Sequence, residues 1–446
     1  MPMITEATPI VHADKIPEEV DVVVIGAGII GTSTAWFLAR RGAKVALIEK
    51  GRVAGEQSSR NWGWIRQQGR DRDELPIVME SNRIWRSLAS ETGEKDLAFA
   101  GCGLAYLAED ERTLAKYEEW HDLAREHQLD TRMLSPATAR EACPGFQGRW
   151  VGGMLTPSDG RAEPFVAVPA LARAARRAGV SITEGCAVRT LETRHGKVSG
   201  VHTERGPVRA DRVVLAGGAW STCFARNAGI DLPQLIVRST VGRTHPVADR
   251  GLPNVSMPGF ATSRRADGGH TVTTGNLIEH YVCARSFQDL AKFVKLLRTS
   301  ARNLRLRPKP PAGHPGAWGS RTRWRADEVT PFERMRVLDP SPSKEGQKRL
   351  TKHLRQRAPW LAEAGMAGAW AGMIDVTPDA VPYICEVPSF PGLFIGTGMS
   401  GHGFGIGPGV GRVLADLVLE RPTGFDLSRF RFERFVDGSP IVPGPY

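Results

Sequence analysis

The sequence predicts an α/β protein that combines a discontinuous Rossmann-like domain with a mixed-sheet α+β domain. The chain has 446 residues, which is more than one hydrophobic core usually organises, so two domains are expected. Apolar β-branched runs followed by glycines occur near the start, in the middle and near the end, at 20–31, 213–218 and 392–401. Such runs are typical of buried parallel strands, and their separation indicates that distant pieces of sequence build the Rossmann-like domain.

The front of the chain has the pattern of a strand, a helix and a second strand. Residues 20–25 (VDVVVI) form an apolar run that favours a buried strand. Residues 29–41 carry apolar side chains without a helix breaker, and 44–49 (KVALIE) favours the second strand. This order predicts a βαβ unit with a right-handed crossover.

The later elements follow from the same periodicities. We expect helices over the ranges 75–91, 109–127, 164–178, 345–358 and 409–420. Short strands are expected between 180 and 215, between 240 and 285 and at 392–398, with a loop rich in Pro, Gly and Arg at 303–320. The expected boundaries are 19–90, 150–240 and 360–435 for the Rossmann-like domain, and 91–149 and 241–359 for the second, substrate-side domain.

Composition narrows the class of protein. Hydrophobic residues make up 41% and charged residues 24% of the chain, as in ordinary globular enzymes. No apolar run reaches transmembrane length and the first residues lack a signal-peptide core, so we expect a cytoplasmic protein. None of the six cysteines is spaced as CxxC or joins a Cys/His cluster, which argues against disulfides and metal sites. The net charge of +11 fits solvated surfaces, an anionic substrate, a partner subunit or anionic lipid, while no aromatic-interleaved basic motif indicates nucleic-acid binding.

A GxGxxG motif, GAGIIG at 26–31, lies between the first strand and the first helix. Gly26 permits the tight turn, and Gly28 lets the backbone approach a pyrophosphate at the helix N-terminus, while Gly31 lets the helix lie close to the strand. Glu49 ends the second strand, where its carboxylate can accept a hydrogen bond from a ribose 2′-hydroxyl and would repel a 2′-phosphate. The sequence therefore predicts dinucleotide binding and disfavours NADP.

The segment after the acidic strand distinguishes FAD from NAD. Residues 55–63 (GEQSSRNWG) are small and polar, which suits a loop that crosses the pyrophosphate and reaches a flavin. The alternative is a surface loop with a helix cap at Ser58 or Ser59. FAD is therefore the favoured cofactor.

With these residues, the sequence resembles a known family. AGEQSSR at 54–60 is similar to the corresponding loop of the L-amino acid deaminases, which belong with glycine oxidase and monomeric sarcosine oxidase to the D-amino-acid-oxidase superfamily of flavoproteins. Further segments resemble the family's motifs in the same order, namely DGRAEP (159–164), VVLAGGAWS (213–221), WRADEVTPF (324–332), GMIDVTPDAVP (372–382) and GTGMSGHGF (396–404). The resemblance extends over nearly the whole chain.

The resemblance implies an FAD-dependent oxidoreductase that oxidises the C–N bond of an amino acid or secondary amine, as an oxidase or a dehydrogenase. In this family hydride passes to flavin N5, and water then hydrolyses the imine. Two alternatives remain open. One is a flavin-carrying subunit of a hetero-oligomeric sarcosine- or opine-type dehydrogenase that needs a partner for turnover. The other is a flavin monooxygenase, which would use NAD(P)H, although the sequence has no second GxGxxG for it.

The motifs and the resemblance together give the expected cofactor contacts. Glycines between 401 and 409 expose backbone N–H groups ahead of the helix expected at 409–420, whose N-terminus can stabilise an anionic reduced flavin. Gly372 matches the covalent flavin cysteine of sarcosine oxidase, so FAD is expected to be bound non-covalently. The expected FAD-binding residues are Gly26, Gly28, Ile29, Ile30, Gly31, Glu49, Lys50, Gln57, Ser58, Ser59, Arg60, Asn61, Trp62, Gly63, Val188, Gly217, Gly218, Trp220, Gly372, Gly398, Ser400, Gly401, His402, Gly403 and Phe404.

The substrate carboxylate is expected to bind an arginine that differs from the family's usual one. In glycine-oxidase-like members this arginine lies where the present chain has Ile374, and the deaminase glutamine near the flavin falls on Trp64. Arg66 is the favoured replacement because it follows the loop expected near the flavin, with Arg264 and Arg285 as alternatives.

Two further residues are candidates for the chemistry. Asp375 could receive or orient a substrate ammonium group, or could serve as a turn or cap residue. His402 lies in the flavin segment, where it could hydrogen-bond the ring or shape the pocket. Arg66, Asp375 and His402 are therefore the expected catalytic residues.

Residues 286–307 predict a basic amphipathic helix. Apolar side chains recur at helical spacing from Phe287 to Leu297, and Lys or Arg residues are interleaved with them. Such a helix could contact the inner face of a membrane or a partner subunit, or simply pack on the sheet of its own domain. The oligomeric state stays open.

Overall fold

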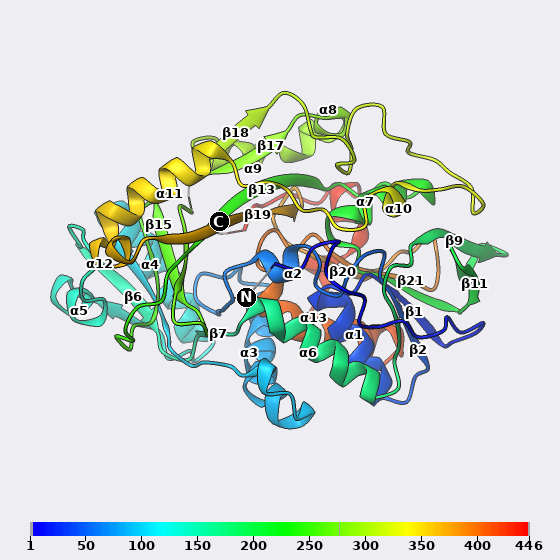
Figure 1. Ribbon diagram of the computed structural model, residues 1–446, viewed down its shortest axis with the longest axis horizontal. Helices are drawn as coiled ribbons and strands as arrows, with labels where there is room; N and C mark the ends of the chain where they lie inside the picture. The colour runs from blue at the N-terminus through cyan, green and yellow to red at the C-terminus, as the bar shows by residue number, and fades with distance from the viewer. Residues whose placement is uncertain (1–2, 276, 445–446) are drawn as a thin grey trace.

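The computed structural model describes residues 3–275 and 277–444, and its strands form two main sheets (Figure 1). The first sheet has the order β20-β21-β12-β1-β2-β8. Its strands are parallel except for β20, which pairs antiparallel with β21 at the edge. They are β1 (Val22–Ile25), β2 (Val45–Ile48), β8 (Ser181–Thr183), β12 (Arg212–Leu215), β20 (Tyr383–Glu386) and β21 (Leu393–Thr397). This is the Rossmann-like sheet that the sequence predicts, assembled from three distant stretches of chain.

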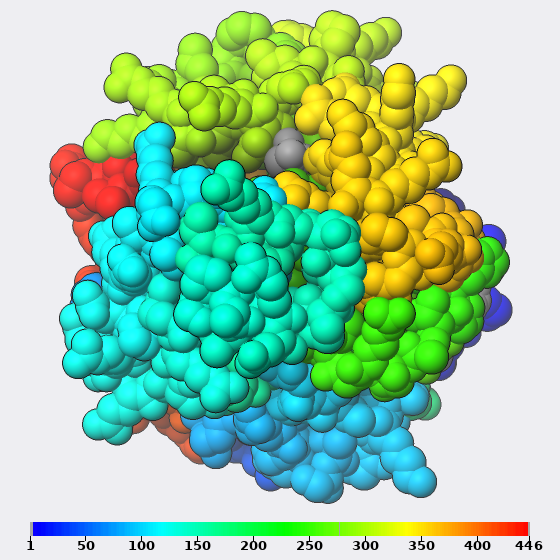
Figure 2. Space-filling model, turned by 90° about the vertical axis from the view of Figure 1, so that its left-hand side faces the viewer, coloured from blue at the N-terminus to red at the C-terminus, as the bar shows by residue number. Residues whose placement is uncertain are grey.

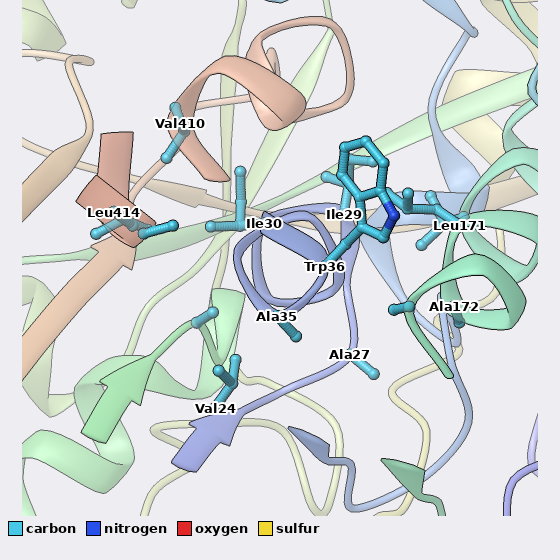
Figure 3. Close-up of a cluster of buried hydrophobic side chains, with 14 of the residues drawn as sticks. Val24, Ala27, Ile29, Ile30, Ala35, Trp36, Leu171, Ala172, Val410 and Leu414 are labelled. Atoms are coloured by element: carbon cyan, nitrogen blue, oxygen red, sulfur yellow. The ribbon is translucent and has the colours of Figure 1, made fainter. Parts of the chain in front are cut away.

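Helix α1 (Ile29–Arg40) is the centre of the helical layer that covers this sheet. It packs between α6 (Pro164–Arg177) and α13 (Gly403–Val418). In Figure 3, Trp36 lies toward Leu171 and Ala172 of α6, whereas Ile30 points toward Val410 and Leu414 of α13. The βαβ unit expected at the front of the chain is therefore confirmed to within two residues at each boundary.

The second sheet has ten strands and covers the carboxyl ends of the first. Its order is β18-β17-β13-β16-β15-β14-β4-β6-β5, and β19 pairs antiparallel with β13 along its whole length. The strands β13 and β19 lie between α11 on one side and α2 on the other (Figure 1). The strands are β4 (Leu104–Ala108), β5 (Arg132–Leu134), β6 (Gly152–Thr156), β13 (Leu235–Thr244), β14 (Asn254–Met257), β15 (Phe260–Arg264), β16 (His270–Thr273), β17 (Ile278–Tyr281), β18 (Leu304–Arg307) and β19 (Met366–Val376).

Helices from distant parts of the chain close the outer side of the second sheet. Figure 2 shows this end of the molecule, where the region around 100–150 (cyan to teal) lies beside the region around 345–365 (yellow to orange). An ion pair of 2.6 Å between Arg357 and Glu109 joins the two regions. The helices are α4 (Glu111–Glu126), α5 (Pro136–Ala142), α11 (Lys344–Arg357) and α12 (Pro359–Ala364).

The remaining elements complete the two domains. They are α2 (Gln57–Arg60), β3 (Trp64–Ile65), α3 (Leu75–Thr92), β7 (Gly160–Arg161), β9 (Val188–Arg194), β10 (Lys197–Thr203), β11 (Gly206–Arg209), α7 (Ser221–Asn227), α8 (Ala284–Gln288), α9 (Leu290–Ser300) and α10 (Pro331–Arg334). Strands β9, β10 and β11 form a small separate sheet. Within the described ranges, none of the helices combines the length and the hydrophobicity that a bilayer-spanning segment needs. All six cysteines are free thiols.

Strands β6, β13 and β19 belong to the ten-stranded sheet. The boundaries expected from the sequence place β6, β19 and most of β13 in the Rossmann-like domain instead, because those ranges begin at 150, end at 240 and resume at 360. Apolar strands of the two domains look alike in sequence, and only their pairing separates them.

Three of the expected elements were wrong in extent. Helix α13 begins at Gly403, six residues before the expected 409, so its first turns contain the glycines that were expected to precede it. The basic segment 286–307 is not one helix, because it divides into α8, α9 and β18. The loop expected at 303–320 begins with β18, whose Leu304–Arg307 pairs in parallel with β17.

Candidate active site

One cavity lies where the strands of the Rossmann-like sheet end and the second sheet begins. Residues at the carboxyl ends of β1, β12 and β21 form one wall, as expected for a ligand site of an open α/β sheet. The opposite wall comes from neighbouring strands of the second sheet, through Ser239 and Val241 of β13 and Gly372 and Ile374 of β19. Because side chains alternate along a strand, residues two apart face the cavity together. The cavity therefore lies between the two domains.

The glycine turn at 26–31 has the backbone that a dinucleotide needs. Gly26 has φ +99°, and a Cβ there would lie 2.6 Å from the carbonyl oxygen of Ala216, the residue after the neighbouring strand β12. A Cβ on Gly31 would lie 1.9 Å from the carbonyl oxygen of Gly26, so only glycine lets α1 approach its strand this closely. Gly28 immediately precedes α1 and lines the cavity, into which the N-terminus of the helix opens. This geometry places a partial positive charge where a pyrophosphate would lie.

The Glu49 carboxylate stands at the end of β2, beside the glycine turn. Its oxygens accept hydrogen bonds from the backbone N–H of Ala27 (2.8 Å) and of Gly51 (2.7 Å). Glu49 and Lys50 also line the cavity. The carboxylate thus tightens the turn and is available to a ribose hydroxyl at the same edge.

The loop at 55–63 crosses the cavity next to α1. Ser58 Oγ accepts a hydrogen bond from the Ile29 N–H at 2.9 Å, which ties the loop to the helix N-terminus. The buried Arg60 side chain donates to the carbonyls of Gly55 and Glu56 and pairs with Asp339 at 3.0 Å. The loop is therefore fixed in place by both domains.

Glu56 organises the nucleotide end of the cavity, although the sequence pattern did not single it out. Its carboxylate accepts hydrogen bonds from Lys50 Nζ (2.6 Å), from Trp220 Nε1 (3.0 Å) and from the Leu338 N–H (3.0 Å). Lys50 Nζ also lies 4.5 Å from the centre of the Trp220 ring. The role of Glu56 could not be predicted from local sequence, because Trp220 and Leu338 are far from it in the chain.

A second helix N-terminus reaches the same cavity from the C-terminal end of the chain. Gly398, Ser400 and Gly401 all have positive φ, so the chain turns sharply between β21 and α13. The first turn of α13, from Gly403 to Gly405, lines the cavity. Two helix N-termini therefore converge on one site, which favours negative charge there.

Asp375 is buried at the end of β19 and binds the turn that follows β21. Its Oδ2 accepts hydrogen bonds from Gln234 Nε2 (2.8 Å), from Thr397 Oγ1 (3.2 Å) and from the Gly398 N–H (2.7 Å). In this geometry the carboxylate joins β19 to the strand–helix junction at the cavity wall. It is nevertheless among the residues that line the cavity.

His402 is the residue before α13, and its side chain is buried. Its imidazole is hydrogen-bonded to the carboxylate of Glu74, the residue before α3. Burial lowers the pKa of His402, and the Glu74 carboxylate opposes this effect. The imidazole is therefore neutral at neutral pH.

Two arginines and two tryptophans lie at the other end of the cavity from Glu49. Trp62 and Trp64 meet edge to face with their ring centres 5.2 Å apart. Arg66 follows β3 and donates to the carbonyl of Gln68, while Arg70 lies one turn further along the chain. Both arginines are among the residues that line the cavity, so this end carries two positive charges.

Most of the residues expected from the sequence line this cavity. They are Gly26, Gly28, Ile29, Ile30, Glu49, Lys50, Gln57, Ser58, Arg60, Asn61, Trp62, Arg66, Val188, Gly217, Gly218, Trp220, Gly372, Asp375, Ser400, Gly401, His402, Gly403 and Phe404. Four expected residues lie behind the wall instead, namely Gly31, Ser59, Gly63 and Gly398. Of the alternative arginines, Arg264 pairs with Asp249 and Arg285 pairs with Asp231, and neither lines the cavity. The front and back glycine segments, which lie near opposite ends of the chain, are thus brought together.

The site residues that sequence patterns did not indicate come mainly from the second sheet. Ser239 and Val241 face the cavity beside Gly372 and Ile374, because β13 and β19 pair in register with Ser239 opposite Gly372. Arg70 was also missed, although its position four residues after Arg66, in the same polar stretch, is a local signal for a second cation at this end of the cavity. Strand pairing between distant segments, by contrast, cannot be read from local patterns.

The described residues suit FAD on two independent grounds. The glycine turn leaves no room for a Cβ at Gly26 or Gly31, so the tight turn and the close helix–strand packing that present the N-terminus of α1 to a pyrophosphate both require glycine. The cavity then continues past the loop at 55–63 to the second helix N-terminus, where an isoalloxazine ring would meet backbone N–H groups. The fold and this cavity define a two-domain dinucleotide-binding protein.

The chain belongs to the family of FAD dependent oxidoreductases known as DAO, whose family model matches residues 21–417. Among solved structures, the L-amino acid deaminase of Proteus myxofaciens in complex with anthranilate is similar with a TM-score of 0.90 and 32% identity, covering 96% of this chain and 97% of that one. Among curated proteins, sarcosine oxidase subunit beta of Arthrobacter sp is 26% identical over 94% of this chain and 92% of its own length. FAD is therefore the cofactor of this fold.

The chain spans about half the length of some of its relatives. It is 25% identical to 4-methylaminobutanoate oxidase (formaldehyde-forming) of Paenarthrobacter nicotinovorans, and the match covers 95% of this chain but 46% of that protein. The shared part corresponds to the whole two-domain unit described above.

Proposed function

We propose that this protein oxidises the C–N bond of an amino acid or an N-alkyl amino acid with FAD as the electron acceptor. The observation that carries the proposal is the convergence of two helix N-termini and two arginines on one cavity between the domains. The similar proteins are named as an L-amino acid deaminase, a sarcosine oxidase subunit and a methylaminobutanoate oxidase, all of which suggest C–N substrates with a carboxylate. Bound FAD supplies a two-electron acceptor for the hydride from the carbon next to nitrogen.

The chain's own residues bind and orient the substrate. Arg66 lies at the basic end of the cavity, where its guanidinium can pair with the substrate carboxylate in a bidentate manner. Trp62 and Trp64 place two packed aromatic rings at this end, and such apolar surroundings strengthen an ion pair. The imine that leaves the site then reacts with water. Asp375 and His402 remain candidates for orienting the amine and for shaping the pocket.

The N-terminal turn of α13 favours the reaction electrostatically. Its free backbone N–H groups point to the part of the cavity that Gly401 and Gly403 line. A developing negative charge there is stabilised by these groups without any side-chain movement.

Anaerobic bleaching of the bound flavin tests the proposal. The purified yellow protein should lose its absorbance near 450 nm when mixed with members of a panel of D-, L- and N-alkyl amino acids, polyamines and opines, in the region where oxidised flavin absorbs. NADH should leave it unchanged. Bleaching by NADH alone would instead indicate a flavin monooxygenase and would overturn the proposal.

Arg66 is tested by substitution with methionine. Loss of a charge-assisted bidentate contact of about 1.5–3 kcal/mol should weaken binding of the reducing amino acid roughly 10- to 150-fold, while the bleaching rate at saturation stays similar. Arg83→Met on α3 is a matched control, because its side chain is 70% exposed and pairs only with Glu80 on the same helix. Unchanged substrate binding in Arg66→Met would remove Arg66 from the site.

A second candidate function is that of a flavin-carrying subunit. The relationship to a protein named as a sarcosine oxidase subunit favours it. In that case the isolated chain would bind FAD and be bleached by substrate, yet turn over slowly with oxygen or dyes as acceptors. A steady-state rate that matches the bleaching rate would exclude this alternative.

The surface around α8 and α9 supports a peripheral location at the cytoplasmic face of a membrane. Phe287 is 64% and Trp318 is 52% exposed, and their rings lie 6.4 Å apart. Lys295 and Arg298 of α9 add positive charge beside them, which complements anionic lipid. Flotation with phosphatidylglycerol vesicles, but not with phosphatidylcholine vesicles, is expected. The absence of flotation with both would contradict this location.

A further inference from the structure

The segment DGRAEP at 159–164 has no role in the site described so far, yet it lies beside β3, the strand that Arg66 follows. Its residues Gly160 and Arg161 form β7, which pairs antiparallel with β3. In the register of this pair, Ile65 lies opposite Gly160. A Cβ on Gly160 would lie 2.3 Å from the carbonyl oxygen of Ala100, so the segment is held tightly from its other side as well.

The Asp159 carboxylate binds the two peptide groups that follow Arg66. Its Oδ1 accepts from the Gln67 N–H at 2.7 Å and from Gln67 Nε2 at 3.3 Å, and its Oδ2 accepts from the Gln68 N–H at 3.1 Å. The side chain of Asp159 is fully buried and does not line the cavity. A buried carboxylate that accepts successive backbone N–H groups fixes the orientation of those peptide planes.

The next peptide of the same turn, which begins with the Gln68 carbonyl, holds the guanidinium group. Arg66 Nη1 donates to the carbonyl oxygen of Gln68, the residue whose N–H is bound by Asp159. Gly69 has φ +69°, and a Cβ there would lie 3.1 Å from Arg66 Nη1, so the arginine folds over this turn. Two hydrogen bonds therefore connect the Asp159 carboxylate to the Arg66 guanidinium.

A hydroxyl relay supports the same turn from the second sheet. Thr156 Oγ1 donates to Gln68 Oε1 at 2.8 Å, and Thr131 Oγ1 lies 2.7 Å from Thr156 Oγ1. Thr156 ends β6, so the ten-stranded sheet and the DGRAEP segment both determine where this turn lies. The turn that follows Arg66 is therefore held by side chains from two separate segments.

We propose that Asp159 is a positioning residue that sets the reach of Arg66 into the cavity and thereby the affinity for the carboxylate of the substrate. The proposal rests on the function proposed above, in which Arg66 binds that carboxylate. Without the Asp159 carboxylate, the 67–68 peptides lose two fixed acceptor contacts and the guanidinium can move with them. A displacement of the guanidinium weakens a bidentate contact because both hydrogen bonds depend on its orientation.

The test is a double-mutant cycle on the FAD-loaded protein, with acetate as the carboxylate probe. Acetate binding is followed through its perturbation of the flavin spectrum, which does not require turnover. Asp159→Asn keeps the shape of the side chain but offers one acceptor oxygen in place of two, so the acetate dissociation constant should rise about tenfold. The bleaching rate at saturating amino acid and the FAD content should both stay within about twofold, because Asp159 does not line the cavity.

Coupling to Arg66 is the decisive result. In the Arg66→Met background, Asp159→Asn should have no further effect on acetate, because the group that it positions is gone. Additive effects of the two substitutions would overturn the proposal. Asp130→Asn is the matched control, because Asp130 accepts a hydrogen bond from Ser158, whereas the backbone N–H groups of Gln67 and Gln68 donate to Asp159.

Arg66→Met and Asp159→Asn distinguish failure of the carboxylate site from failure of the positioning role. If Arg66→Met leaves acetate and amino acid binding unchanged, the proposed carboxylate site itself fails. If Arg66→Met weakens binding and Asp159→Asn does not, only the positioning role fails. Should Asp159→Asn not fold, Thr156→Val removes the hydroxyl that binds Gln68 and Thr131 and should raise the acetate dissociation constant about threefold. An unchanged constant in that variant would equally refute the role of the turn.

Discussion

The imidazole Nε2 of His402 lies 2.9 Å from Oε1 of Glu74, and both side chains are buried. Each of these residues immediately precedes a helix, since Glu74 precedes α3 and His402 precedes α13. The pair therefore joins the starts of two helices at the wall of the cavity. Because burial lowers the pKa of His402, its neutral ring donates the Nε2 proton to the carboxylate, and the tautomer is fixed.

Replacing Glu74 should destabilise the fold. Glu74→Leu leaves a buried imidazole N–H without this acceptor, and we expect the free energy of unfolding to fall by about 3 kcal/mol in urea titrations. Glu74→Gln, which retains an acceptor oxygen, should cost less than half as much. Glu126→Gln is the control, because the exposed pair of Glu126 with Arg72 contributes little to stability. Equal effects at the two sites would show that burial of the His402 pair has no energetic consequence.

Replacing Glu49 should release the cofactor without unfolding the protein. Glu49→Ala removes the carboxylate that binds the glycine turn, and loss of charge-assisted hydrogen bonds should weaken FAD binding by at least about tenfold. The ratio of flavin to protein absorbance after gel filtration measures this loss. Asp21→Asn should retain FAD, since Asp21 binds the Lys44 N–H at the other end of the same strands. Full flavin retention in Glu49→Ala would argue against this carboxylate as an FAD contact.

At the glycines of the βαβ unit, a steric clash should cost more stability than backbone strain. Gly31→Ala places a Cβ 1.9 Å from the carbonyl oxygen of Gly26, so we expect a colourless and less stable protein. Gly42→Ala meets nothing within 4 Å but occupies φ +88°, and it should cost about 1 kcal/mol while FAD stays bound. Thermal unfolding and the visible spectrum distinguish the two. A yellow and stable Gly31→Ala protein would mean that α1 can move away from its strand.

Asp159 should make stability depend on pH in a defined direction. Burial raises the pKa of Asp159 to about 6, against the opposing hydrogen bonds from Gln67 and Gln68 and the positive charge of Arg66. Between pH 3.8 and pH 6 the folded chain therefore binds a proton that the unfolded chain does not, so this group's contribution to stability is lost as pH rises through 6.

Urea unfolding at several pH values measures this contribution. The difference in unfolding free energy between the wild type and Asp159→Asn should grow in favour of the wild type as pH falls from about 7 to about 4, by up to about 3 kcal/mol. Because the same other groups titrate in both proteins, their contributions to the unfolding free energy cancel in this difference. A difference that is constant over this range would show that Asp159 titrates near its ordinary value.

Local sequence predicted the nucleotide half of the molecule well because its signals are local. The strand–glycine–helix pattern at 20–41 and the acidic residue at 49 depend on neighbours in sequence, and the structure places them as expected. The second sheet was harder to predict. Leu304–Arg307 becomes a strand only because Ile278–Tyr281 is beside it, and no periodicity within 303–320 indicates that pairing.

The start of helix α13 was predicted six residues too far along the chain for a related reason. Glycine has a low intrinsic helix propensity, so a run with five glycines from 401 to 409 predicts a loop. In the structure the helix forms because its neighbours leave no room for side chains. A Cβ on Gly409 would lie 2.6 Å from the carbonyl oxygen of Ile77 in α3, and one on Gly407 would lie 2.5 Å from Ile29 in α1. Tertiary packing overrides propensity here.

The close contacts of Gly407, Gly409 and Gly411 determine where the pocket can diversify. At these glycines of α13 even one added methyl group would collide with α1 or α3. The opposite wall, made by Ser239, Val241 and Ile374, consists of ordinary side chains on paired strands, which can be exchanged while the strand pairing persists. Variants of this fold that acquire new substrates, in nature or by laboratory selection, should therefore keep the α13 glycines and carry their substitutions on β13 and β19.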